Sequence, residues 1–197
     1  MDWVEELDRA LRRSVSEICV RDEDESVIAF SGGLDSSLLA VFIPDVPLYS
    51  VAVKGSEDER WVIEAGEMME REVNLVSVEV DEDIVIKVMN IIGSPNPLDV
   101  SLAIPLYILG ERIASDGHKY IITGHGADEL FGGYARYRIS PREELMRMDF
   151  EKVVEHDIQR DKKVVGVWGC ELIAPYLHPD IVKTAFSIPV EMKVSGE

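Results

Sequence analysis

Cysteine, aromatic residues and basic residues are all scarce in this sequence. Its 197 residues include only two cysteines, Cys19 and Cys170, which lie far apart and outside any CxxC pattern. This spacing argues against zinc ribbons and iron–sulfur clusters and predicts two buried thiols in a reducing compartment. An aromatic content of 7% beside 46% hydrophobic residues is typical of a globular protein rather than a disordered or fibrous one.

The shortage of basic residues excludes whole classes of partner. There are 20 Lys and Arg residues against 38 Asp and Glu, so the net charge is −18. Such a chain repels phosphate backbones and anionic lipids unless its cations are segregated, and no basic segment is present. No hydrophobic run is long enough to cross a membrane, and the helical N-terminus carries acids that a secretory signal lacks. We therefore expect a cytoplasmic protein that binds neither nucleic acid nor membranes.

The length predicts one domain, large enough to bury a core without disulfides or structural metal. We expect residues 1–25 to form an N-terminal helix, residues 26–140 a nucleotide-binding α/β core, and residues 141–197 a helical extension of the same domain.

Short β-rich runs alternate with helical periodicity along the predicted core. The predicted strands are 26–30, 48–53, 74–80 and 119–123, and the predicted helices include 57–73, 83–92 and 99–116. This alternation predicts an α/β fold with a doubly wound parallel sheet of about four to five strands and helices on both faces. Ligands bind such sheets beyond the carboxyl ends of the strands, where we expect two glycine-rich loops, 31–37 and 123–133, to face one crevice.

The first loop, in the sequence AFSGGLDSS, places Ser31, Gly32 and Gly33 between a strand and a helix. Bare backbone N–H groups and the positive end of a helix then converge on one point, which favours an anion. No lysine follows the glycines as in a Walker loop, and the GxGxxG pattern is absent. Asp35 would repel a phosphate here unless a divalent cation lay between them, so the loop predicts a polyphosphate bound with Mg²⁺. The alternative is a structural turn in which Asp35 and Ser36 cap the helix.

Two strings resemble known signatures. SGGLDSS resembles the pyrophosphate loop of the ATP pyrophosphatase (PP-loop) superfamily, whose members cleave ATP to AMP and pyrophosphate while adenylating a substrate. GHGADELFGGYARY, at 124–137, resembles the asparagine synthetase signature S-G-E-G-[AS]-D-E-L-F-G-G-Y. SLAIPLY (101–107) and DIQRDKKVVGVWGCELIAPYL (157–177) are similar to further segments of that family, in the same order. The resemblance spans roughly residues 26–193 and implies an adenine nucleotide alpha hydrolase-like fold.

The resemblance implies sites in both loops. ATP would be bound by Ser31, Gly32, Gly33, Asp35, Ser36, Ser37, Val53, Thr123 and Gly124, with the backbone of Val53 against adenine. Asp35 and Asp128, one from each loop, would bind Mg²⁺, which lets carboxylates lie in a phosphate crevice. Lys163 matches a lysine that faces the pyrophosphate. Glu129 matches the glutamate of the motif, although an acid in a first helical turn also complements the helix dipole, and both interpretations stay open.

His125 stands where the family motif has its catalytic glutamate. The family uses this position to handle the proton of the attacking nucleophile, and a neutral imidazole can accept such a proton near neutral pH. We expect His125 and Glu171, from the segment matching W-G-x-E, to form a catalytic dyad at the acyl carbon. The alternative is a histidine that caps the helix or lies in solvent.

Several departures from the family pattern bear on activity. Ile173 replaces an arginine, and His178 replaces an aspartate. The late catalytic lysine of the family is expected beyond Lys193, so either a tail is missing or that function is absent. Asp2 stands where the glutaminase domain of the family has its nucleophilic cysteine. We therefore expect a synthetase domain without a glutaminase domain, supplied with ammonia from solution or by a separate protein.

The resemblance implies an asparagine synthetase-like amidoligase that forms AMP and pyrophosphate, with ATP and Mg²⁺ as cofactors. It would adenylate a small-molecule carboxylate, by default aspartate, and transfer the acyl group to ammonia or another amine. One alternative is a catalytically silent ATP-binding paralogue, favoured by Ile173 and the missing lysine. Another is a tRNA-modifying PP-loop enzyme, disfavoured by the net charge and the lack of paired cysteines.

Overall fold

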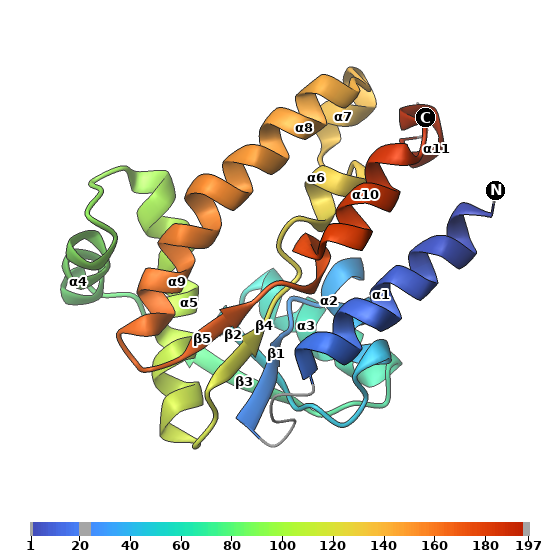
Figure 1. Ribbon diagram of the computed structural model, residues 1–197. Helices are drawn as coiled ribbons and strands as arrows, with labels where there is room; N and C mark the ends of the chain where they lie inside the picture. The colour runs from blue at the N-terminus through green and yellow to red at the C-terminus, as the bar shows by residue number, and fades with distance from the viewer. Residues whose placement is uncertain (1, 20–24, 195–197) are drawn as a thin grey trace. The chain divides into compact units, whose positions relative to one another are not determined.

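The structure, a computed structural model, describes residues 2–19 and 25–194, with the backbone alone at 18 and 19 (Figure 1). The chain forms two compact units. Unit 1 comprises residues 1–21, 124–158 and 174–197, and unit 2 comprises residues 22–123 and 159–173. The single domain expected from the sequence stays a prediction.

Unit 2 is built on a five-stranded sheet. Its strands are β1 (Ser26–Ala29), β2 (Leu48–Val53), β3 (Val73–Val78), β4 (Tyr120–Ile122) and β5 (Glu171–Ile173). They lie in the order β3-β2-β1-β4-β5, and every neighbouring pair is parallel. The predicted parallel α/β sheet is confirmed. Strand β5 is a difference from the sequence analysis, because it lies in the segment that was expected to be helical.

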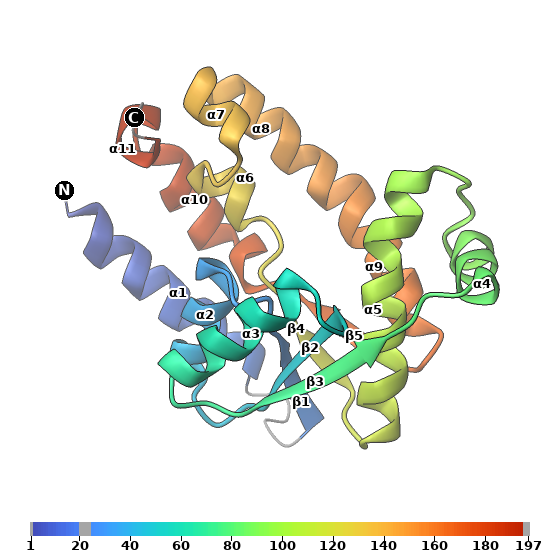
Figure 2. The same ribbon diagram turned by 180° about the vertical axis from the view of Figure 1, so that it is seen from behind.

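Helices cover both faces of this sheet, which Figures 1 and 2 show from opposite sides. They are α2 (Leu34–Phe42), α3 (Glu57–Met68), α4 (Glu82–Ile92), α5 (Pro97–Ser115) and α9 (Ile158–Gly166). The side chains of β3 show the two faces by their alternation. Ser77 lies 3.5 Å from Glu59 of α3 on one face, whereas Val76 and Val78 pack with α4 and α5 on the other. This confirms the doubly wound arrangement.

Helix α3 ends five residues earlier than the sequence predicts. The chain leaves the helix through Glu70, whose φ is +54°, and the N–H of Arg71 donates to the carbonyl of Gly66 at 3.0 Å. The Arg71 guanidinium also donates to the carbonyls of Ala40 at 3.1 Å and Val46 at 2.6 Å. These tertiary hydrogen bonds outweigh the local helical propensity of the segment.

Strand β1 lies at the centre of the sheet, with β2 on one side and β4 on the other. Where the connections from a central strand run to opposite sides of the sheet, a crevice forms beyond the carboxyl ends of the central strands. Val27 and Ile28 of β1 are 0% exposed, as expected for a strand covered on both faces. The sheet therefore places the ends of β1, β2 and β4 side by side.

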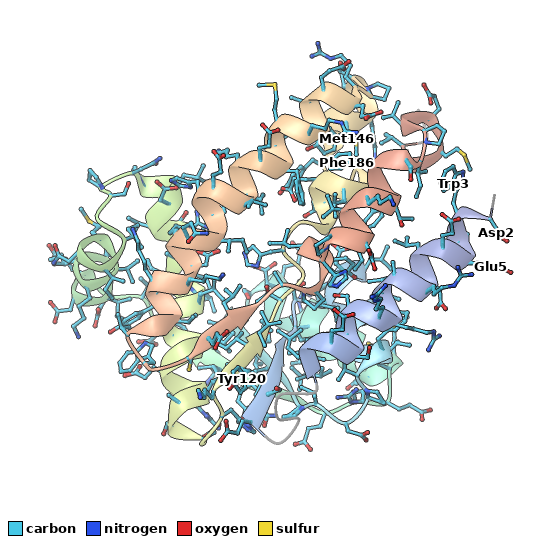
Figure 3. All side chains as sticks on the ribbon, viewed as in Figure 1. Asp2, Trp3, Glu5, Tyr120, Met146 and Phe186 are labelled. Atoms are coloured by element: carbon cyan, nitrogen blue, oxygen red, sulfur yellow. The ribbon has the colours of Figure 1, made fainter. Side chains whose placement is uncertain are left out.

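Unit 1 is helical. It contains α1 (Trp3–Cys19), α6 (Ala127–Phe131), α7 (Ala135–Ile139), α8 (Glu143–Lys152), the π-helical η2 (Val153–Asp157), the 3-10 turn η3 (Pro175–Leu177), α10 (Pro179–Ser187) and α11 (Val190–Lys193). Helix α1 packs along η3 and α10, where the Ser14 hydroxyl donates to the Pro175 carbonyl at 2.8 Å. Met146 and Phe186 belong to a small core shared by α7, α8, α10 and α11 (Figure 3).

The two predicted thiols have separate outcomes. Cys170 is buried, with its Sγ 3.7 Å from the Gly110 carbonyl oxygen. The side chain of Cys19 lies outside the described residues. No helix within 2–19 or 25–194 combines the length and apolar character needed to cross a membrane.

Candidate functional site

The first loop joins β1 to α2 in unit 2. The buried hydroxyl of Ser36 accepts a hydrogen bond from the Ser31 N–H at 3.2 Å and donates to the Gly33 carbonyl at 3.1 Å. Gly33 is the N-cap of α2 and has no side chain, so neither Asp35 nor Ser36 caps this helix. The structural-turn alternative is therefore wrong about the cap, while Gly32 does adopt a positive φ, as that alternative expects. The N-terminal amides of α2 can therefore bind an anion.

Gly32 lets the loop pass close under α3. Its φ is +73°, and a Cβ there would lie 3.0 Å from Cδ1 of Trp61 and 3.1 Å from Cβ of Ala65. A larger residue at position 32 would have a strained backbone and would clash with Trp61 and Ala65. Asp35 and Ser37 are half-buried in the first turn of α2, and the Ser37 N–H donates to Gly33 at 3.0 Å.

A pocket of about 290 Å³ lies beside the first loop, at the carboxyl end of β1 and along β2. Its lining includes Phe30, Ser31, Val51, Val62, Pro105 and Leu109, from β1, β2, α3 and α5. Val53 ends β2 two residues after Val51 and is 57% exposed. Apolar walls beside an exposed strand end suit a flat aromatic ring.

Thr123 lies just beyond the carboxyl end of β4. It is 3% exposed, and its N–H donates to the Ile173 carbonyl at 2.8 Å, with its hydroxyl 3.4 Å from the same oxygen. Strand β5 therefore supports Thr123 through the backbone of Ile173. The side chain of Ile173 cannot supply the charge of the arginine that it replaces.

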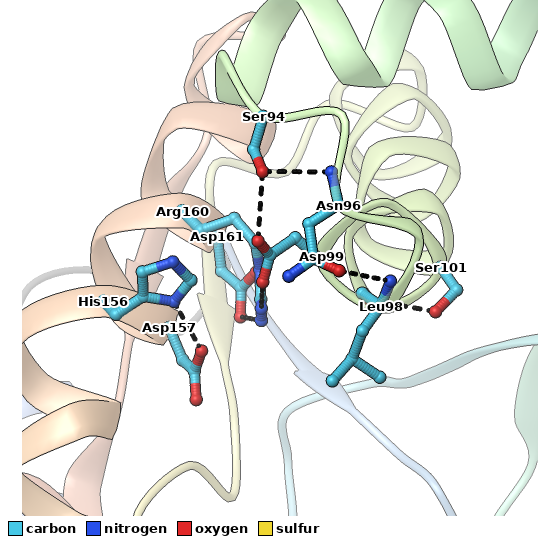
Figure 4. A network of polar contacts seen from close by, with 9 residues as sticks. All are labelled: Ser94, Asn96, Leu98, Asp99, Ser101, His156, Asp157, Arg160 and Asp161. Carbon is cyan, nitrogen blue, oxygen red and sulfur yellow. Dashed lines mark hydrogen bonds and ion pairs between the residues drawn. The ribbon is translucent and has the colours of Figure 1, made fainter.

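Lys163 lies on α9, which is joined to α5 by buried charges within unit 2 (Figure 4). Arg160 makes two hydrogen bonds to Asp161, at 2.7 and 3.1 Å, and its Nη1 lies 3.5 Å from Oδ1 of Asp99 in the first turn of α5. The Ser94 hydroxyl donates to Asp99 at 3.1 Å. Lys163 itself is exposed, one turn further along α9.

Glu171 begins β5 at the amino edge of the sheet. It pairs in register with Tyr120, at the start of β4, and its N–H donates to the Lys119 carbonyl at 2.8 Å. Thr123 lies past the other end of β4, about 10 Å away at the usual rise of a strand. The side chain of Glu171 is exposed. The dyad of Glu171 with His125 stays a prediction.

The second loop, in unit 1, surrounds α6 with glycines. Gly126 is the N-cap of α6 at φ +91°, and a Cβ there would lie 2.6 Å from Cδ2 of Leu177. A Cβ on Gly133 would overlap the carboxylate of Asp128. The glycines therefore serve both the backbone conformation and the close packing of this loop.

The two acids of the second loop have different surroundings. Asp128 is half-buried, burial raises its pKa, and its carboxylate makes no hydrogen bond or ion pair with the described residues. Glu129 is 3% exposed, and its Oε1 accepts a hydrogen bond from the Tyr134 hydroxyl at 2.6 Å. Burial also raises the pKa of Glu129, while the hydrogen bond from Tyr134 lowers it. Asp128 thus has no positively charged partner among the described residues, whereas Glu129 is buried and bonded to Tyr134.

Gly124 and His125 connect the sheet to α6. Both are half-buried, and the Gly124 carbonyl accepts a hydrogen bond from the Ala127 N–H at 3.3 Å. Because α6 has Gly126 as its N-cap, His125 is not the capping residue of this helix. It is also not a fully solvated side chain.

His178 has a structural role that the sequence analysis missed. Its Nδ1 accepts a hydrogen bond from the Asp180 N–H at 3.2 Å and caps α10, and its Nε2 lies 3.1 Å from Oε2 of Glu17. Since Nδ1 accepts, Nε2 carries the proton and donates to Glu17. The position of His178 directly before Pro179 indicates this capping role, because proline is common in the first turn of a helix.

The side chains fit a Mg²⁺ ion that is held largely by phosphate oxygens. Within the described ranges, no group of three or more His, Cys, Asp and Glu residues could hold a metal by itself. Mg²⁺ on a nucleotide needs only one or two carboxylates. Asp128 has a carboxylate without a hydrogen-bonding partner among the described residues, and Asp35 is half-buried in the first turn of α2. Both side chains are hard oxygen donors of the required kind.

Comparison with known proteins extends these observations. The chain is 37% identical over 207 residues to an asparagine synthetase homologue of Methanocaldococcus jannaschii, covering 97% of this chain and 37% of that protein. It is 29% identical to the nodule asparagine synthetase of Pisum sativum (85% and 32% covered) and 26% identical to asparagine synthetase B of Escherichia coli (97% and 39% covered). The chain thus spans between 32% and 39% of the length of these relatives.

A solved structure, the NH3-dependent NAD synthetase of Campylobacter jejuni, aligns over 95% of this chain and 93% of that chain, with a TM-score of 0.44 and 12% identity. This likeness is too low to bear on fold or function. The sequence profile described as asparagine synthase matches residues 6–144 and 138–197, which together cover both loops and all five strands. The chain belongs to the asparagine synthase family.

Proposed function

We propose that this chain carries the ATP-dependent amide-forming activity of its family, adenylating a carboxylate with release of pyrophosphate and passing the acyl group to an amine. The relatives described above are glutamine-hydrolyzing asparagine synthetases, so aspartate with ammonia is the default substrate pair.

The observation that carries the proposal is the state of Asp128. A half-buried carboxylate with no partner among the described residues costs stability, and such groups cluster at sites where a ligand supplies positive charge. A nucleotide with its divalent cation would do so.

Residues of unit 2, together with Gly124, would bind the nucleotide. The pocket beside β1 and β2 would hold adenine, with the backbone of Val53 at its edge. The first loop, through Ser31, Gly32, Gly33, Ser36 and Ser37, would hold the phosphates with its N–H and hydroxyl groups. Thr123 and Gly124 would flank the ribose and the α-phosphate, and Lys163 would neutralise charge on the departing pyrophosphate.

Asp35 and Asp128 would hold Mg²⁺, which supplies charge stabilisation on the phosphates when bound. In the first step a substrate carboxylate oxygen attacks the α-phosphorus and pyrophosphate leaves. In the second step an amine nitrogen attacks the acyl carbon, AMP leaves with the bonding electron pair, and neutral His125 accepts the proton of the amine.

One observation favours a second candidate, a catalytically silent ATP-binding paralogue. Ile173 is half-buried in β5, next to Ile122 of β4, and it brings an apolar side chain to a position where the family has arginine. A chain of this kind would bind ATP without adenylating a substrate.

A pyrophosphate-release assay across a panel of amino-acid carboxylates, with and without ammonium, tests the proposal. We expect release that depends on ATP, Mg²⁺ and one carboxylate, with AMP as the matching product. ADP and inorganic phosphate as main products would overturn the ligase assignment. ATP binding by calorimetry without release on any carboxylate would favour the silent paralogue.

A further inference from the structure

The neighbouring acids Asp128 and Glu129 belong to one motif, but only one of them is available to a ligand. We propose that Glu129 and Tyr134 form a positioning pair that holds the Asp128 carboxylate in place for the divalent cation of the nucleotide. Asp128 is then the only cation ligand among the carboxylates of the second loop. This inference rests on the proposed function, because it assumes that the loop binds a nucleotide with its cation.

The geometry of the turn carries the proposal. The N–H groups of Gly132 and Gly133 both donate to the carbonyl oxygen of Asp128, at 2.9 Å each. The carboxylate of Asp128 lies against Gly133, in the space that a side chain there would occupy. The turn after α6 therefore sets where the Asp128 carboxylate can lie.

The hydrogen bond from Tyr134 to Glu129 spans this turn. It joins the residue directly after Asp128 to the residue directly after Gly133, with an oxygen–oxygen distance of 2.6 Å. Glu129 is 3% exposed, so its carboxylate is closed off from solvent. A short hydrogen bond from a hydroxyl to a buried carboxylate is among the stronger kinds in proteins. Closing the turn in this way limits the motion of the two glycines between its ends.

Tyr134 is itself held in place by α7 and α8. The Arg136 guanidinium lies 4.4 Å from the centre of the Tyr134 ring, and the Tyr137 ring lies 5.6 Å away. Arg136 pairs with Asp149 of α8 at 2.9 Å, and the Tyr137 hydroxyl donates to the same carboxylate at 2.7 Å. The hydroxyl of Tyr134 is thus presented to Glu129 from a packed aromatic cluster.

A simpler interpretation gives Glu129 only the task of complementing the dipole of α6. That task requires an acid in the first turn, but not its burial and not a tyrosine hydroxyl at hydrogen-bond distance. Helix α6 is five residues long, so its dipole is small. The two interpretations predict different effects of removing the Tyr134 hydroxyl on the position of Asp128.

The test compares Tyr134→Phe with two controls. Tyr134→Phe removes the hydroxyl and keeps the ring under Arg136. Glu129→Gln keeps an oxygen acceptor of similar shape for Tyr134. Tyr137→Phe removes the neighbouring hydroxyl, whose partner is Asp149 rather than Glu129. Two quantities are measured in each protein: the Mg²⁺ concentration that gives half-maximal ATP binding, and amide hydrogen exchange at Gly132 and Gly133 without ligand.

In Tyr134→Phe we expect the Mg²⁺ requirement to rise about tenfold, as for loss of an outer partner of a metal ligand. Faster exchange at both glycines should accompany it. Glu129→Gln should stay closer to the wild type than Tyr134→Phe does, and Tyr137→Phe should leave the Mg²⁺ requirement unchanged even where it lowers the melting temperature.

A Mg²⁺ requirement within twofold of the wild type in Tyr134→Phe overturns the inference, and so does unchanged exchange at the two glycines. An equal rise in Tyr137→Phe also overturns it, because the effect would then be general loosening of unit 1. ATP binding by the wild-type protein that needs no divalent cation overturns the proposed metal site first, and the inference falls with it.

Discussion

A carboxylate oxygen of Asp128 occupies the space in which a side chain on Gly133 would begin. The same glycine donates its N–H to the Asp128 carbonyl at 2.9 Å, so the two residues are fixed to each other by backbone and by contact. A carboxylate packed on a bare Cα, without a hydrogen-bonding partner among the described residues, depends on that glycine for its position.

Gly133→Ala should therefore impair the site more than the fold. The new methyl group would displace the Asp128 carboxylate, and we expect ATP affinity in the presence of Mg²⁺ to fall about tenfold or more. Calorimetric titration of ATP at fixed Mg²⁺ measures this. Gly55→Ala is the control for replacing a glycine, since its Cβ would meet no atom within 4 Å, although its φ of +76° carries a backbone cost of its own. Unchanged ATP affinity in Gly133→Ala would contradict the prediction.

Asp35→Asn and Asp128→Asn should each weaken binding of ATP with Mg²⁺ while the fold is retained. Asp128→Asn should also preserve or raise the melting temperature at neutral pH. The reason is that burial raises the pKa of Asp128, so its charged form opposes folding, and an amide removes that charge. Calorimetry and thermal unfolding on the same samples give both values. Undiminished affinity in both variants would exclude the metal assignment.

His125→Ala should slow amide formation far more than adenylation, whereas Lys163→Ala should slow adenylation itself. Pyrophosphate release reports the first step, and amide product measured in the same reaction reports the second. Glu171→Gln decides whether the sequence-based dyad holds. The dyad predicts that this variant slows amide formation as His125→Ala does. Unchanged amide formation in Glu171→Gln would contradict the dyad.

Asp99→Asn should destabilise unit 2 strongly. Arg160, Asp99 and Asp161 are 8%, 9% and 1% exposed, and removing one member of a buried charged group typically costs about 3–5 kcal/mol. Urea denaturation followed by a probe in unit 2 measures the change. Arg12→Gln, which breaks an exposed ion pair with Asp8 on α1, should have little effect. Equal effects of the two variants would show that the buried group contributes no more than a surface pair.

Lys193 should make stability rise with pH in the alkaline range. Its pKa is lowered from 10.5 to about 8, chiefly because burial disfavours the charged amine, with Glu143 acting against this and Arg147 adding to it. Between those values the unfolded chain binds the proton and the folded chain does not, so the free energy of unfolding increases as pH rises. Below pH 8 the Lys193 amine is charged in the folded state, and the burial of that charge destabilises the fold.

Lys193→Met should therefore stabilise the protein at pH 7, by about 1–2 kcal/mol once solvent screening of this half-buried side chain is allowed for. It should also flatten the rise in stability between pH 8 and 9.5. Measurement stops at pH 9.5 because the pKa of Tyr49 is raised from 10.0 to about 12, which lowers stability as pH increases above 10. A variant with the same slope as the wild type would refute the prediction.

The parts of the site that can be predicted from the sequence are those formed by residues adjacent in the chain. The anion-binding loop at 31–37 requires a strand, two glycines and a helix start in succession, so its pattern can be read locally. Strand β1 was equally readable, because a strand covered on both faces is a short continuous apolar run. Strand β5 was missed, since Glu171–Ile173 is three residues long and becomes a strand only by pairing with β4.

The sequence by itself determined the parallel α/β fold, the two glycine-rich loops and the family, because alternation of short-range patterns and contiguous motifs carries that information. Tertiary structure alone decided that Glu129 is buried and bonded to Tyr134, whereas its neighbour Asp128 is half-buried. Asp128 and Glu129 are chemically similar neighbours, and no local pattern distinguishes them. The Tyr134 hydroxyl and the packing of α7 and α8 bury Glu129 and leave Asp128 without a partner among the described residues. Burial and hydrogen bonding set the chemistry of a carboxylate, and both depend on the folded chain.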